Sequence, residues 1–259
     1  MTYIKLNKNF RNDIMPPARY ITDIGSLNDN AIEDGIRKAL ELTITLEHNT
    51  VILHLPTKDH LRFLAPILGD STIRDLKRSN SSRFNDIIVN LNTQSIEISD
   101  WTEDIVFSLY PRGRMLDNLN DLNRARAIIV VPWTDDDRQS YITTWNPEII
   151  SGDESQAEDL DLDPRIEAAL QALTNMINVS TGLMHSSDKD SAIQLLRIIH
   201  QRGIELKPNE MKIWALQHGW TSDGANSLEE YSQGVLDGRR YRTGNVSMWN
   251  ESYINELLE

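Results

Sequence analysis

The stretch AIIVVPWTDDD, residues 127–137, is the clearest indication of the fold: it consists of an apolar run, a proline, and then polar residues that can begin a helix. VILHLPTKDHL (51–61) and IVFSLYPRGRML (105–116) repeat this order. The apolar runs are dense enough to be buried on both faces, as parallel strands usually are. Proline fits at a strand's end or in a helix's first turn, where no backbone N–H is needed. The repeats predict strands at Val51–Leu55, Ile105–Tyr110 and Ala127–Val131.

The other patterns in the first 152 residues are consistent with a layered α/β domain. Residues 31–46 carry apolar side chains at helical spacing, and Ile87–Leu91 and Ile96–Ile98 are strand-like. The last two runs could instead pair as a hairpin that turns at Asn92-Thr93, which would make the sheet mixed. The basic stretch Arg74–Arg83 suggests an exposed loop. We therefore predict an N-terminal α/β domain over residues 1–152, with a mostly parallel sheet.

An acidic segment separates this domain from a second, all-helical one. Residues 153–163 are rich in Asp and Glu and lack bulky apolar periodicity, which is typical of a solvated linker. A helical domain with a C-terminal tail is predicted over residues 164–259. Helical patterns, each with a glycine near its C-terminal end, extend over residues 164–179, 187–201, 209–217 and 223–239. The tail is expected to hold one more short element around Trp249.

Composition excludes several kinds of chemistry. The chain has 259 residues, a formal net charge of −13 and no cysteine, which excludes disulfides, thiolate nucleophiles and cysteine–zinc sites. It contains no GxxxxGK[ST], GxGxxG, HExxH or GxSxG motif. No apolar run approaches the ~20 residues of a membrane span, and no secretory signal is evident. We expect a soluble, cytoplasmic protein with no cofactor and no metal site, and both binding and enzymatic roles stay open.

The turns after the three predicted strands form one candidate ligand site. Parallel sheets bind ligands at the carboxyl edge, where these turns would meet. Anion-binding groups there are Thr57 and Lys58 in the first turn, and Arg112, Gly113 and Arg114 in the second. Asp135–Asp137 in the third turn would repel an anion unless a divalent ion were bound. The alternative is ordinary turn chemistry, with both arginines paired to surface acids.

The helical half contains a candidate partner-binding surface. Trp214 precedes a tight turn at Gly219-Trp220, and a second helix follows. This outline resembles a helix–turn–helix, but the second helix is acidic, which disfavours nucleic acid as a partner. Trp214 is assigned to the core and Trp220 to a contact surface. The candidate contact residues are Trp220, Tyr231, Arg239, Arg240 and Tyr241, although the basic group 238–242 can equally be a helix C-cap.

Two hypotheses of different classes follow. The favoured one is a non-enzymatic interaction or assembly protein that binds a protein partner, or a second copy of itself, through the helical module and its aromatic turn. The alternative is an α/β domain that binds an anionic ligand, a nucleotide or phosphate, or acts as an enzyme, through the strand-edge turns. Neither hypothesis includes a membrane or a nucleic-acid partner.

Overall fold

A computed structural model describes residues 16–153, 159–244 and 249–259. Its first part contains a seven-stranded sheet in the order β3-β4-β2-β5-β6-β1-β7. Neighbouring strands are parallel except for the β3–β4 pair. The strands are β1 (Ala18–Ile21), β2 (Thr50–Leu55), β3 (Ser81–Phe84), β4 (Ile87–Thr93), β5 (Ile105–Leu109), β6 (Ala127–Val131) and β7 (Glu148–Ile149).

Helices cover both faces of this sheet. They are α1 (Asp29–Thr45), the 3-10 helix η1 (Lys58–Leu64), α2 (Ala65–Ser79), α3 (Arg114–Asp121) and α4 (Asp135–Trp145). Alternate residues of each central strand point to opposite faces. Phe107 therefore belongs to the core under α1 and α2, whereas its neighbour Val106 belongs to the core under α3 and α4. The central strands are buried on both faces for this reason.

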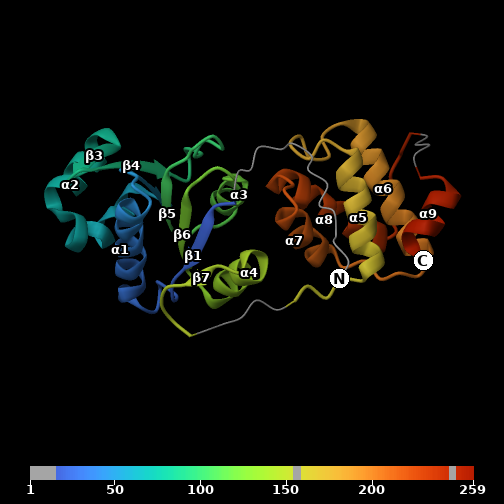
Figure 1. Cartoon of the computed structure of the whole chain (residues 1–259), viewed down its shortest axis with the longest axis horizontal. Coiled ribbons are helices and arrows are strands. Elements are labelled where there is room, and N and C mark those ends of the chain that lie inside the picture. The colour runs from blue at the N-terminus through green and yellow to red at the C-terminus, as the bar shows by residue number, and fades with distance from the viewer. Residues whose placement is uncertain (1–15, 154–158, 245–248) are drawn as a thin grey trace, which may run out of the picture.

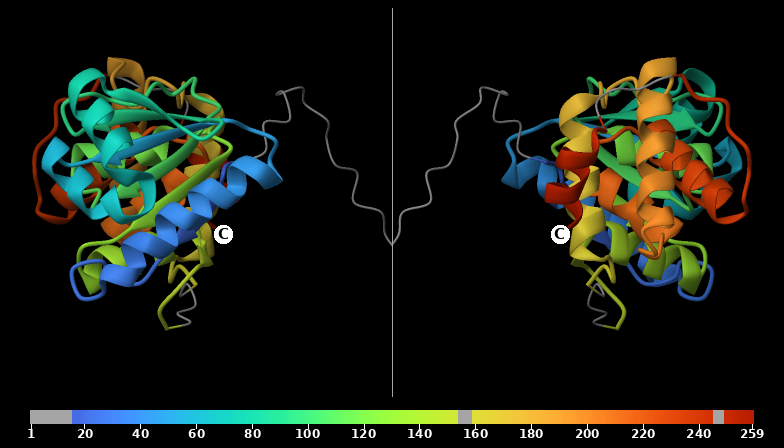
Figure 2. Two further views of the ribbon diagram at one scale, coloured as in Figure 1. Left: turned by 90° about the vertical axis from the view of Figure 1, so that its left-hand side faces the viewer. Right: turned by 90° about the vertical axis from the view of Figure 1, so that its right-hand side faces the viewer.

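The second part of the chain is helical. It consists of α5 (Pro164–Met176), α6 (Ser186–Gln201), α7 (Pro208–Gln217), α8 (Ser222–Leu236) and α9 (Glu251–Leu258). Within the described residues from 159 onward there is no strand. These helices enclose one apolar core that includes Leu170, Leu196 and Trp214. The right-hand view of Figure 2 shows α5, α6 and α9 at the end of the molecule farthest from the sheet.

The two parts meet through α3 and α4 on one side and α7 and α8 on the other (Figure 1). The Gln217 amide donates to the Thr144 carbonyl at 2.9 Å, and the Ser222 hydroxyl donates to the Asp117 carbonyl at 3.0 Å. The acidic segment predicted as a linker, 153–163, includes residues 154–158, which lie outside the described residues. The predicted division into domains therefore stays a prediction.

The predicted fold class is confirmed: a mostly parallel sheet with helices, followed by a helical region. The alternative of a hairpin that turns at Asn92-Thr93 is wrong. The antiparallel pair is β3–β4, which turns at Asn85-Asp86, and Ile96–Ile98 forms no strand. Asn85 accepts this turn because asparagine tolerates its positive φ of 55°.

The basic stretch Arg74–Arg83, expected as a loop, is the end of α2 followed by β3. Its one apolar residue, Leu76, is buried against the sheet, and this packing outweighs the local polar composition. Two short strands, β1 and β7, were not predicted. Each has too few residues to establish an alternating pattern of its own.

Candidate functional site

The three strand–proline turns come together at the carboxyl edge of the sheet, as predicted. They follow β2, β5 and β6, which are adjacent parallel strands. A pocket of about 270 Å³ lies at this edge. Its lining includes Pro56 and His60 after β2, Tyr110 and Arg112 after β5, Trp133 after β6, and Gln94 after β4. Four neighbouring strands thus contribute to one pocket.

Aromatic rings form much of this pocket. The Tyr110 and Trp133 rings meet edge to face with their centroids 4.7 Å apart, and the His60 ring is 6.1 Å from that of Tyr110. Trp133 is 42% exposed, although it belongs to a residue type that usually packs into cores. Tyr110 has a φ of 55°, an uncommon value for a bulky residue that costs about 1–3 kcal/mol where it occurs. Such strain is concentrated at functional sites.

Arg112 spans two of the turns. Its Nε and Nη2 donate to Asp137 Oδ2 at 3.0 and 2.6 Å, and Nη2 also donates to Thr134 Oγ1 at 3.3 Å. Burial alone would raise the pKa of Asp137, but hydrogen bonds from Arg112 and Thr134 hold it below the usual value. Asp137 and Thr134 also form the capping box that begins α4. The Arg112 charge is therefore already paired, which is the alternative considered for this arginine.

The other predicted anion-binding residues are placed differently, and none of them lines the pocket. Gly113 is the N-cap of α3 with φ 50°, which suits glycine. The Arg114 guanidinium makes no ion pair or hydrogen bond within the described ranges. Thr57 bonds His60 Nδ1 at 2.9 Å and so orients a pocket residue. Lys58 donates instead to the Lys77 carbonyl near the end of α2, at 2.9 Å.

Trp220 is not a surface residue, so the expectation that it contacts a partner is wrong. It is only 2% exposed and belongs to the helical core, where its indole Nε1 donates to Thr174 Oγ1 at 2.9 Å. The turn at Gly219 places the ring inward, between the helices. This arrangement is favoured because burying so large an apolar side chain stabilises the region by about 3 kcal/mol or more. The sequence pattern showed a tight turn but not the direction of its side chains.

The remaining predicted contact residues lie at the end of α8. Tyr231 and Tyr241 pack edge to face, with ring centroids 5.6 Å apart, and both are only partly buried. Arg239 and Arg240 are exposed. Arg239 pairs with Glu230 at 3.1 Å and stacks over the Tyr241 ring at 5.5 Å. These residues lie on and just beyond the last turns of α8, and Arg239 also lines a groove beside that helix.

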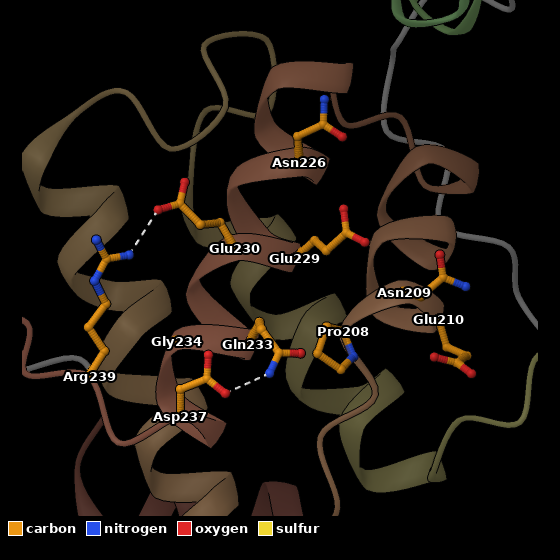
Figure 3. Close-up of a pocket in the computed structure, with 10 residues that line it drawn as sticks. All are labelled: Pro208, Asn209, Glu210, Asn226, Glu229, Glu230, Gln233, Gly234, Asp237 and Arg239. Carbon is orange, nitrogen blue, oxygen red and sulfur yellow. Dashed lines mark hydrogen bonds and ion pairs between the residues drawn. The ribbon is translucent and has the colours of Figure 1, made fainter. Parts of the chain in front are cut away.

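A groove of about 900 Å³ lies between α7 and α8 (Figure 3). Its charged lining residues are Glu210, Glu229, Glu230, Asp237 and Arg239. Figure 3 shows Glu229 pointing from α8 toward α7, whereas Glu230 points the other way, to Arg239. Lys212 pairs with Glu229 at 2.9 Å and Gln233 donates to Asp237 at 2.8 Å. Glu210 has no ion pair in the part of the chain that the structure describes.

Sequence reasoning missed both the groove and most of the pocket lining. Trp133 could have been predicted, because it directly follows Pro132 in the strand–proline turn of residues 127–137. Gln94 was not predictable, because it lies in a short polar stretch between two strand-like runs and has no signal of its own. The groove carboxylates come from two helices, and no local pattern indicates that these two faces leave a hollow between them.

Neither a metal centre nor a membrane span emerges from the described residues. Among them, no three His, Asp or Glu side chains are grouped so as to hold a metal ion. The acidic turn at Asp135–Asp137 is used instead for capping and for the Arg112 pair. No helix in these ranges is both long and apolar enough to cross a bilayer.

Part of the chain is similar to a known protein family. Residues 162–258 match the model of a family described as a domain of unknown function, DUF1889. The matched segment contains α5 to α9, so the similarity concerns the helical region, and the family description names no activity. No curated protein matches the chain.

Proposed function

We propose that this protein is a non-enzymatic interaction protein that binds a basic segment of a partner protein in the groove between α7 and α8. The groove carries the proposal: it is a hollow of about 900 Å³ in which carboxylates outnumber cations. Grooves that bind a segment of another protein are typically concave and partly apolar, with charged groups at the rim.

Charge selects the kind of partner. The groove lining contains the carboxylates of Glu210, Glu229, Glu230 and Asp237 and a single cation, Arg239. The whole chain has a formal net charge of −13. Complementary potentials accelerate association and exclude wrong partners, so a Lys- or Arg-rich segment fits and a nucleic-acid backbone does not. The partner surface predicted around Tyr231 and Arg239 is retained in a modified form, with the groove in place of the aromatic turn.

The proposal is tested with a defined cationic probe. A fluorescein-labelled helical peptide of alternating Lys-rich and Ala-rich turns is titrated with the full chain and followed by fluorescence anisotropy. We expect saturable one-to-one binding. The double variant Glu210→Gln/Asp237→Asn should weaken it by about twofold to thirtyfold, because rim charges contribute about 0.2–1 kcal/mol each. Neither substitution removes a buried group.

A matched control separates the groove from overall charge. The double variant Asp70→Asn/Asp86→Asn removes the same charge from exposed carboxylates in the sheet region and should leave affinity unchanged. Amide chemical-shift changes on adding peptide should concentrate in α7 and α8. Equal weakening by both double variants, or shift changes away from these helices, would refute the proposal.

A further inference from the structure

The pocket at the carboxyl edge lies at the topological switch point of the sheet. From β2 the chain passes through η1 and α2 to β4, on one side; from its neighbour β5 it passes through α3 to β6, on the other side. Because α2 and α3 also cover opposite faces, the turns after β2 and β5 diverge and leave a crevice. Ligands of open α/β sheets bind in this crevice. The pocket lined by Pro56 and Tyr110 occupies it.

The walls of the pocket suit a flat ring. Trp133, Tyr110 and His60 supply aromatic surfaces, and Met115 and Pro56 supply further apolar contact. The exposed portion of Trp133 is available for stacking, and its edge-to-face contact with Tyr110 restrains the indole. A pocket of about 270 Å³ is small, just below the usual range for ligand pockets, and so suits a single ring rather than a larger molecule.

Two polar groups at the pocket can form hydrogen bonds with the nitrogen and oxygen atoms at the edge of such a ring. Gln94 presents an amide, which both donates and accepts and can pair with an adenine edge. Arg112 is oriented by Asp137 through Nε and Nη2, and its Nη1 makes no hydrogen bond among the described residues. A guanidinium nitrogen held in this way can donate to a ring nitrogen or a carbonyl oxygen.

The surrounding charge argues against an anion as the main determinant. Asp137 already neutralises Arg112, and Asp135 and Asp136 stand beside it in the first turn of α4. We propose that this pocket binds a nucleobase, a flat heteroaromatic ring with hydrogen-bonding edges, either free or as part of a nucleoside or nucleotide. The site is separate from the α7–α8 groove and does not depend on the function proposed there.

The test is calorimetric titration of the full chain with adenine, guanine, cytosine and uracil, each as base, nucleoside and nucleoside monophosphate. We expect at least one base family to bind, with the nucleoside no weaker than its monophosphate. A preference for the monophosphate of more than about tenfold would show that the phosphate dominates, and would overturn the assignment.

Variants locate the site. Trp133→Ala should lower affinity at least fivefold, whereas Trp133→Phe should retain most of it. Trp101→Ala is the matched control: Trp101 is also exposed, at 69%, but precedes β5 at the opposite edge of the sheet, and its loss should change nothing. Gln94→Ala should alter the ratio of affinities between bases. The inference fails if no compound binds at millimolar concentration, or if Trp133→Ala and Trp101→Ala change the affinity equally.

Discussion

The Asp121 carboxylate, at the end of α3, accepts a hydrogen bond of 2.7 Å from the backbone N–H of Ser222, at the start of α8. A side chain of the sheet region thus caps a helix of the helical region. Burial raises the pKa of Asp121, although the hydrogen bonds from Ser222 act in the opposite direction. The positive end of the α8 dipole favours a carboxylate here, so the cap is one of the contacts that join the two regions.

Replacing Asp121 should weaken this junction. Asp121→Ala leaves the buried Ser222 N–H without its acceptor and should lower the free energy of unfolding by about 1–2 kcal/mol. Asp121→Asn keeps an acceptor oxygen and should lose less. Urea denaturation measures both, and hydrogen exchange at Ser222 should accelerate in the alanine variant. Unchanged exchange at that amide would mean that the cap contributes nothing to the junction.

His54 should make stability fall in mild acid. This residue of β2 is 1% exposed, and burial lowers its pKa from 6.5 to about 4. The unfolded chain therefore binds a proton at His54 before the folded chain does. Stability from this residue is fully present above pH 6.5 and is lost as pH falls toward 4, by about 3 kcal/mol in total.

The matched variant for this effect is His54→Gln, which keeps a polar group near Ser108 Oγ, 3.4 Å from His54 Nδ1 in the parent. Denaturation midpoints of both proteins between pH 7 and pH 4.5 measure the difference. The variant should lose less stability over this interval than the parent. Parallel curves for the two proteins would contradict the lowered pKa.

Trp220→Ala should destabilise the helical region rather than abolish partner binding selectively. The indole is buried and donates a hydrogen bond to the Thr174 hydroxyl, so the substitution leaves a large cavity and removes that hydrogen bond. A loss of about 3–5 kcal/mol is expected from chemical denaturation. Trp220→Phe should cost less because it fills most of the space. A Trp220→Ala variant with the stability of the parent would place the side chain on the surface after all.

Substitutions of Asn80 should show how much the left-handed backbone conformation at the end of α2 affects stability. It is the C-cap with φ 58°, and its side-chain Oδ1 is buried without a hydrogen-bond partner in the described structure. Asn80→Gly removes that oxygen and suits the left-handed conformation, so stability should stay equal or rise by up to about 1 kcal/mol. Asn80→Ala should be less stable than Asn80→Gly by about 1 kcal/mol, because alanine has a Cβ that is strained in this conformation and glycine has none. Thermal unfolding should rank glycine above alanine, and the reverse order would contradict the strained backbone.

Much of the fold was predictable because its signals are local. The strand at Ala127–Val131 is a continuous apolar run, and the helix that follows begins with Thr134 and an acidic first turn. Such features depend on adjacent residues alone. The antiparallel partner of Ile87–Leu91 was not predictable in this way. The alternative considered was Ile96–Ile98, whereas the actual partner, Ser81–Phe84, overlaps a polar stretch that was expected to be a loop.

The candidate sites were predictable only in part. The meeting of the three turns was expected from the repeated strand–proline pattern. Their contacts were not: Arg112 pairs with Asp137 across 25 positions of sequence, and Gln94 enters from a fourth strand. The groove between α7 and α8 depends on the packing of two helix faces, which no single segment specifies.

Local sequence patterns were enough to predict most helices and the buried parallel strands, because hydrophobic periodicity and capping residues act over a few consecutive positions. Tertiary structure alone decided the order of the strands, the inward direction of Trp220, the cap from Asp121 to Ser222, and the hollow beside Glu229. These features join residues far apart in the chain. Their free energy comes from burial and hydrogen bonding that exist only once the distant segments have met.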